Sequence, residues 1–188
     1  MNVKERADAV GVLRFVNVML METLAAWVPT TPEMEAKVLF GRHIWRIAQQ
    51  ADALGHRARE LRAPLHYSLA PAADCLRAFR MGADLEDTGQ RIEGFYEVLL
   101  GALATGYETY LERTDRLLDE PTVVICESAL PNIGSMKTEK ARLVEEFPRL
   151  RTPTGSLAIL RETMAASEGI LARTQLSSDG GRIRAARV

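Results

Sequence analysis

The sequence predicts an all-α fold built around a four-helix bundle. Three observations lead to this prediction: long stretches without proline in which apolar residues recur every three or four positions, short proline-containing connections between them, and no strand-like alternation of useful length. The 188 residues, of which 47% are hydrophobic, suffice for one domain with its own core. We expect that domain over residues 1–174 and a flexible basic tail over 175–188.

The first two predicted helices form an antiparallel hairpin. The first helix runs from about Lys4 to Val28 and stops at the proline-rich sequence of residues 29–32. The second begins at Pro32, carries acidic residues in its first turn and extends to about Arg62. Because the connection between two long helices is short, they must pack side by side in opposite directions.

The remaining elements complete a layout of hairpin, long crossover and hairpin. Residues 63–82 form the crossover, with a short helix at about 73–80. A third long helix is expected from Asp84 to Leu118, and a fourth starts at Pro121. Residues 131–134, with the sequence Pro-Asn-Ile-Gly, predict a break in the fourth helix before it continues to about Phe147. An extra C-terminal helix is expected from Ser156 to about Arg173.

Charge and cysteine content exclude several classes of partner. The 24 basic residues nearly balance the 25 acidic ones, so we expect neither a nucleic-acid nor a membrane-surface partner. Cys75 and Cys126 match no zinc or redox spacing and are expected to be reduced, semi-buried thiols. The N-terminus does not resemble a secretory signal, and the apolar run at 15–28 is interpreted as too short to cross a bilayer. These features predict a cytoplasmic protein.

Four polar residues fall on apolar helix faces. Glu22 lies within the apolar run of the first helix, so its carboxylate is predicted to be buried. In the second helix, His43 and Gln50 share the spacing of the core-facing residues, and in the third helix Glu93 lies in line with Leu100 and Tyr107. Taken alone, His43 is more readily interpreted as a hydrogen-bonded core histidine than as a functional one. Glu22 could likewise hold a buried arginine such as Arg14 or Arg46.

Helix lengths place Glu22, His43 and Glu93 at similar heights in the predicted bundle. Two carboxylates and an imidazole at one level would form a candidate site, because burial shifts pKa values toward those of proton-transfer groups. Around them Trp45, Tyr96, Tyr107, Met19 and Met21 would line an apolar wall, and Gln50 would contact the substrate.

Two sequence stretches resemble bacterial ferritin-like domains. They are residues 40–54, FGRHIWRIAQQADAL, and residues 110–125, YLERTDRLLDEPTVVI. The resemblance implies a four-helix bundle with a di-metal centre of iron or manganese, held by two single glutamates and two Glu-x-x-His pairs. Glu22 and Glu93 match the single glutamates, but the two pairs fall on Ile47 and Gln50 and near Ile133 and Met136. The resemblance therefore implies a degenerate metal site.

Three functions compete. The first is an enzyme that transforms a small-molecule substrate in the former metal cavity without a cofactor, with Glu22, His43 and Glu93 as acid and base groups. The second is a non-catalytic assembly or regulatory module, in which the C-terminal helix could cover a second subunit of a homodimer or simply cap its own bundle. The third is an atypical one- or two-metal oxidase that binds Fe or Mn through Glu22, His43 and Glu93.

Overall fold

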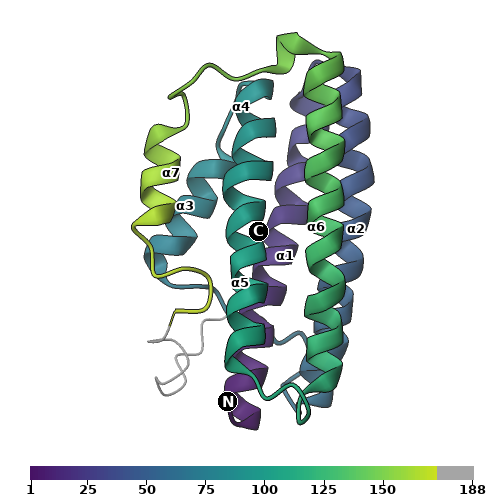
Figure 1. The fold of residues 1–188 in the computed structure, drawn as a ribbon, viewed down its shortest axis with the longest axis vertical. Coiled ribbons are helices and arrows are strands. Elements are labelled where there is room, and N and C mark those ends of the chain that lie inside the picture. The colour runs from purple at the N-terminus through teal and green to yellow at the C-terminus, as the bar shows by residue number, and fades with distance from the viewer. Residues whose placement is uncertain (173–188) are drawn as a thin grey trace.

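A computed structural model describes residues 1–172 of the chain, and within this range every regular element is a helix. The predicted all-α class is therefore confirmed. Four long helical rods stand side by side, and two short helices cover one flank (Figure 1). Each rod packs against the rods on either side of it, so the four rods enclose a common core.

Helices α1 (Val3–Thr30) and α2 (Met34–Glu60) form the first hairpin. The start of α1 is fixed by a capping box, in which the Asn2 side chain accepts a hydrogen bond from the Glu5 amide and the Glu5 carboxylate accepts one from the Asn2 amide. Thr31 closes α1 by donating its hydroxyl to the Trp27 carbonyl, at 2.8 Å. Because residues 31–33 are the whole connection, α2 returns antiparallel along α1.

A long connection then carries the chain back to the top of the bundle (Figure 1). Residues 61–72 pack along the lower half of α1, where the Leu69 amide donates to the Gly11 carbonyl at 3.2 Å. Helix α3 (Ala73–Ala83) follows, and its end is held near the hairpin tip because the Trp27 indole donates to the Ala83 carbonyl.

The third rod contains three segments: α4 (Thr88–Glu93), the π-helix η1 (Gly94–Leu99) and α5 (Leu100–Arg113). A π-helix accommodates an additional residue in its turn, which rotates everything after it relative to everything before it. The predicted helix over 84–118 is thus present in shortened form, with a change of register that the sequence pattern did not reveal.

Helix α6 (Glu120–Glu146) is continuous, so the predicted break at 131–134 is wrong. Pro131 lacks an amide hydrogen and cannot bond to the Glu127 carbonyl, but both residues are exposed, so water can satisfy that carbonyl. On the opposite side Ala129, Ile133 and Met136 are buried in the core. Burial of this face holds the helix together through the proline.

The C-terminal part is a 3-10 turn, η2 (Pro148–Leu150), and a short helix, α7 (Ala158–Ala165), that packs against α3 and η1. The predicted helix from 156 to 173 is therefore much shorter. It ends at Ala165, and the chain beyond it turns at Gly169, whose φ of +81° is left-handed. The predicted tail at 175–188 lies outside the described residues.

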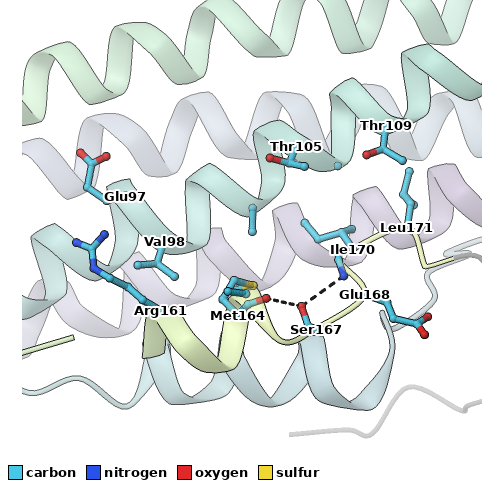
Figure 2. A pocket seen from close by; sticks show the side chains of 14 residues that line it. Glu97, Val98, Thr105, Thr109, Arg161, Met164, Ser167, Glu168, Ile170 and Leu171 are labelled. Carbon is cyan, nitrogen blue, oxygen red and sulfur yellow. Dashed lines mark hydrogen bonds between the residues drawn. The ribbon is translucent and has the colours of Figure 1, made fainter. Parts of the chain in front are cut away.

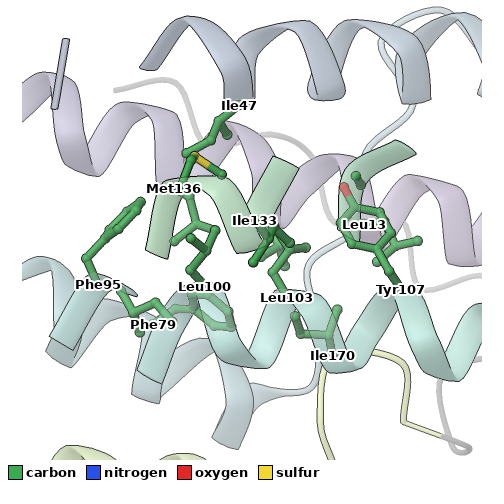
Figure 3. Packing of buried hydrophobic residues seen from close by; sticks show 14 of the residues in the cluster. Leu13, Ile47, Phe79, Phe95, Leu100, Leu103, Tyr107, Ile133, Met136 and Ile170 are labelled. Carbon is green, nitrogen blue, oxygen red and sulfur yellow. The ribbon is translucent and has the colours of Figure 1, made fainter. Parts of the chain in front are cut away.

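The core fills the space between the rods with large side chains (Figure 3). Leu13 of α1, Ile47 of α2, Leu103 of α5 and Ile133 of α6 meet there, each nearly inaccessible to solvent. Cys75 and Cys126 are free thiols and fully buried, rather than semi-buried as predicted.

Helix α1 is, among residues 1–172, the one helix long and apolar enough to cross a membrane by length and composition. The apolar run predicted at 15–28 is part of this longer helix. More than half of its most apolar stretch is buried against the rest of the molecule. The core helix of a bundle meets the same criterion.

Candidate functional site

His43 of α2 is a polar group of the bundle interior that is inaccessible to solvent. Its Nδ1 lies 2.6 Å from the hydroxyl of Tyr96, which belongs to the π-helix η1. Its Nε2 lies 3.3 Å from the Glu139 carboxylate of α6. Glu139 in turn accepts hydrogen bonds from Arg42 and Arg46, at 2.9 and 2.8 Å. Three rods therefore contribute to one chain of polar groups that runs from core to surface.

The chemistry of this chain fixes its proton positions. An ionised carboxylate can only accept, so Nε2 of His43 must carry the hydrogen and donate it to Glu139. Nδ1 is then the acceptor, and the Tyr96 hydroxyl donates to it. Both imidazole nitrogens are thus engaged within the protein. No nitrogen of His43 is left to receive a proton from a substrate.

Electrostatics reinforce this arrangement. Burial lowers the pKa of His43 to about 4, against the attraction of Glu139, so the ring is neutral at physiological pH. Burial opposes ionisation of Glu139, but the hydrogen bonds from Arg42, Arg46 and His43 outweigh it and lower its pKa to about 2. Burial raises the pKa of the Tyr96 hydroxyl well above 10. At neutral pH each group is therefore locked in one protonation state.

Glu22 does not join this cluster, because its side chain is exposed. The prediction of a buried carboxylate is therefore wrong. Although α1 is apolar on nearly every side, its outward side carries Glu22, Ala25 and Pro29, which no other element covers. The apolar run of the sequence thus includes exposed positions that hydrophobicity alone could not separate from buried ones.

Glu93 is only half-buried and lies on the flank of its rod, so its prediction as an interior carboxylate is also wrong. Its oxygens pair with Lys140 of α6 at 2.7 Å and with Arg161 of α7 at 2.9 Å. The reason is the π-helix, which begins one residue after Glu93. The added residue removes Glu93 from the line of Leu100 and Tyr107, on which the prediction depended.

The remaining predicted residues divide between the core and the surface. Tyr107 is fully buried, and its hydroxyl accepts a hydrogen bond from the Asn17 amide at 2.7 Å. Gln50 is half-buried and donates to the Ile125 carbonyl at 2.9 Å, and Met19 is half-buried. Trp45 is 66% exposed, so its predicted place on an interior wall is wrong. It lies on the outward side of α2, opposite the buried residues Phe40 and Ile47.

The interior between these residues has almost no free space. The cavity bordered by Ile47, Gln50, Tyr107, Ile133 and Met136 has a volume of only about 10 Å³. This is roughly one water molecule, whereas small-molecule sites usually measure about 300–1,000 Å³. Between these residues there is therefore no room for the substrate that the prediction placed there.

The donor set does not fit a metal ion. Within residues 1–172, no three His, Cys, Asp or Glu side chains come together in a way that could hold one. Where a ferritin-like centre needs its Glu-x-x-His pairs, Ile47 and Met136 offer hydrocarbon and thioether, and the Gln50 amide donates to backbone. The alternative ligand set of Glu22, His43 and Glu93 is not brought together.

Glu139 was missed in the sequence because of the break predicted at 131–134. In the continuous α6, the buried positions Ala129, Ile133 and Met136 continue by one turn to Glu139. If the helix is taken as unbroken, the same spacing identifies Glu139 as a residue next to the core. Tyr96, by contrast, was expected on the apolar wall, but its pairing with His43 required the π-helix.

A second buried polar cluster lies at the opposite end of the bundle. The Asp119 carboxylate is inaccessible to solvent and accepts hydrogen bonds from Tyr110, Thr114, Thr122 and Arg57, at 2.6 to 2.9 Å. Because all of these partners come from the ends of α5, α6 and α2, the cluster ties the lower connection to the bundle. Both carboxylate oxygens of Asp119 are hydrogen-bonded within the protein, which indicates a structural role for the cluster.

A hollow of about 490 Å³ lies outside the bundle, between the third rod and α7 (Figure 2). Val98 and Met164 form part of its apolar lining, and Arg161 lies near one end. Thr105 and Thr109 of α5 border it, and neither hydroxyl has a hydrogen-bond partner among the described residues. Other helical threonines of the chain, such as Thr23, donate to the carbonyl four residues earlier.

Comparisons of the chain with protein-family models, with curated proteins and with solved structures found no match.

Proposed function

We propose that this chain is a non-catalytic helical module with a ferritin-like bundle, which acts by binding another macromolecule on its outer surface. The single observation that carries the proposal is the closed interior. The space bordered by Ile47, Tyr107 and Met136 is only about 10 Å³, and the buried His43 is bonded at both nitrogens within the protein. A bundle without interior space or a free proton-transfer group lacks the basis for interior catalysis.

The ferritin-like part of the proposal is supported by the order of the rods. The α1–α2 hairpin, the long connection through α3, and the second hairpin of the third rod and α6 follow the layout of that scaffold. The ligand positions are occupied by residues that fill space. Loss of metal ligands with retention of the packed scaffold is what a change from chemistry to assembly would leave behind.

Metal binding by the purified protein tests this proposal directly. Equilibrium dialysis against Fe(II) and against Mn(II), followed by elemental analysis, is expected to give no stoichiometric metal in either case. His43→Gln serves as the matched variant, because the amide preserves a donor and an acceptor while removing the imidazole. Stoichiometric metal in the parent protein that is lost in His43→Gln would overturn the proposal.

A second candidate function is small-molecule chemistry in the outer hollow between the third rod and α7. The specific observation in its favour is the pair of unbonded hydroxyls on Thr105 and Thr109 in a space of ligand size, which the Glu93-paired Arg161 borders at its other end. This would move the predicted enzyme site from the bundle centre to its flank.

Ligand-observed NMR with a library of small polar fragments tests the second candidate. Ala102→Met would fill the floor of the hollow, and Ala141→Met would add the same side chain at an exposed position of α6 as a control. Fragments that bind the parent protein and the control but not Ala102→Met support the candidate. Binding that is equal in all three proteins, or absent from all, contradicts it.

A further inference from the structure

We infer that the outward face of α2 binds a second copy of this chain, with a two-fold axis that passes close to Gly41. The inference rests on the proposed function in that it names the partner of the outer surface. It is carried by a protruding side chain on this face, a matching depression between α2 and α6, and complementary charges on α1 and α2.

Three large apolar side chains stand on this face. Met34, Val38 and Trp45 are 65%, 54% and 66% exposed, and their spacing of four and seven residues places them on one side of α2. Isolated exposed apolar residues are ordinary, but a row of three that includes a tryptophan is a feature of interaction sites. Trp45 is the residue that protrudes from this row.

A depression of about 470 Å³ lies beside Val38, between α2 and the end of α6. Its apolar lining comes from Met34, Val38, Leu39, Leu143 and Phe147. The guanidinium groups of its rim can stack on an aromatic ring, as that of Arg149 already does on Phe147 in this chain. The depression therefore suits an indole.

The protrusion and the depression are related by symmetry. Trp45 and Val38 are seven residues apart, which is about 10 Å along a helix. A two-fold axis perpendicular to α2 and midway between them would place each Trp45 in the depression of the other copy. Both contacts form at once, because a two-fold interface uses the same patch twice.

Gly41 lies next to the midpoint. It is exposed, and a Cβ atom built on it would meet no other atom within 4 Å. Glycine costs an α-helix about 1 kcal/mol relative to alanine, and no contact among residues 1–172 requires it. At the axis, however, the absence of a side chain lets the two helices approach closely enough for Trp45 to reach its pocket.

The charges on this face match under the same rotation. Glu22 and Lys37 have no ion-pair partner among residues 1–172. Counted from the hairpin tip, Glu22 of α1 lies at the same height in the bundle as Arg42 of α2. The two-fold rotation near Gly41 therefore brings Glu22 to the height of Phe40 in the second copy. That position is within one helical turn of Lys37. Each copy thus offers a carboxylate to the other copy's ammonium group.

Sedimentation velocity over a range of concentrations tests the inference. The parent chain is expected to form a dimer, and Trp45→Ala to weaken its Kd by about 30-fold or more, because a buried tryptophan anchor is typically among the strongest contributors to an interface. Ile159→Ala is the matched control, since Ile159 is 71% exposed but lies on α7, away from this face. It is expected to leave the Kd unchanged.

Two glycine variants separate dimer formation from folding. Gly41→Leu has space in the single chain but blocks the axis, so it is expected to give a folded monomer. Gly134→Leu makes the same change at an exposed glycine of α6 that also has open space around it, and should remain dimeric. Far-UV circular dichroism of both variants verifies that the helices are retained.

A charge exchange tests the predicted register. Glu22→Lys should weaken the dimer by placing two ammonium groups together, and addition of Lys37→Glu should restore it. A parent chain that is monomeric at all concentrations, or a dimer that survives Trp45→Ala and Gly41→Leu, overturns the inference. Either result leaves the dialysis experiment unaffected, so failure of this inference is distinguishable from failure of the proposed function.

Discussion

The bundle interior and the outward face of α2 distribute polar and apolar groups in opposite ways. In the interior, His43 is paired at both nitrogens with Tyr96 and Glu139. On the outward face of α2, Trp45 and Met34 are mostly in contact with solvent, and neither Lys37 nor Glu22 of the adjacent α1 has an ion-pair partner among the described residues. The interior has its contacts satisfied and the outer face does not, which indicates where a partner would bind.

Truncation of one apolar side chain in each region should give the largest contrast. Leu100→Ala, at a fully buried position, is expected to lower the free energy of unfolding by about 2–5 kcal/mol, because it removes contacts and leaves a cavity. Trp45→Ala should change the stability of the single chain by less than about 0.5 kcal/mol. Urea denaturation at a concentration low enough to dissociate any dimer measures both. Equal losses would contradict the comparison.

The paired histidine should make the interior sensitive to acid. The folded-state pKa of His43 is lowered to about 4 from 6.5, so the unfolded chain takes up a proton first as the pH falls. The contribution of His43 is therefore complete above pH 6.5, is lost between pH 6.5 and about 4, and amounts to about 3 kcal/mol.

The free energy of unfolding, measured across this pH range, checks the sign of the contribution of His43. Glu139, whose pKa is lowered to about 2, adds a further loss only below pH 4.5. The window between pH 6.5 and 4.5 therefore isolates the histidine. His43→Gln should flatten the slope in that window, whereas replacement of the exposed His56 should not. A parent protein equally stable at both ends of the window would show that His43 is not held neutral.

A small change in the free energy of unfolding is expected when an exposed glycine is replaced by alanine. Gly134→Ala should stabilise the chain by up to about 1 kcal/mol, because alanine is the better helix former and the added Cβ has open space. Gly41→Ala should stabilise the single chain by a similar amount and yet weaken the dimer. Thermal unfolding of both variants, with the dimer Kd measured in parallel, checks this. A parallel gain in stability and in affinity for Gly41→Ala would contradict an axis at this residue.

The two hairpins and the crossover could be predicted because they depend on local signals. The prolines at 29 and 32 and the apolar periodicity of α2 each act within one or two turns, and periodicity placed His43 in the core. Errors arose where a local rule was overridden by packing. Pro131 should break a helix, but burial of Ile133 and Met136 on the opposite side keeps α6 continuous.

By itself, the sequence determined the all-helical class, the number of long rods and the burial of His43. These features depend on the periodicity of apolar residues and on the prolines between the helices. Tertiary structure alone decided that Glu22 faces solvent, that the π-helix turns Glu93 to the flank, and that Tyr96 and Glu139 meet His43. The physical reason is that periodicity identifies which side of a helix is apolar. Which neighbours cover that side, and in what register, depends on contacts between residues distant in the chain.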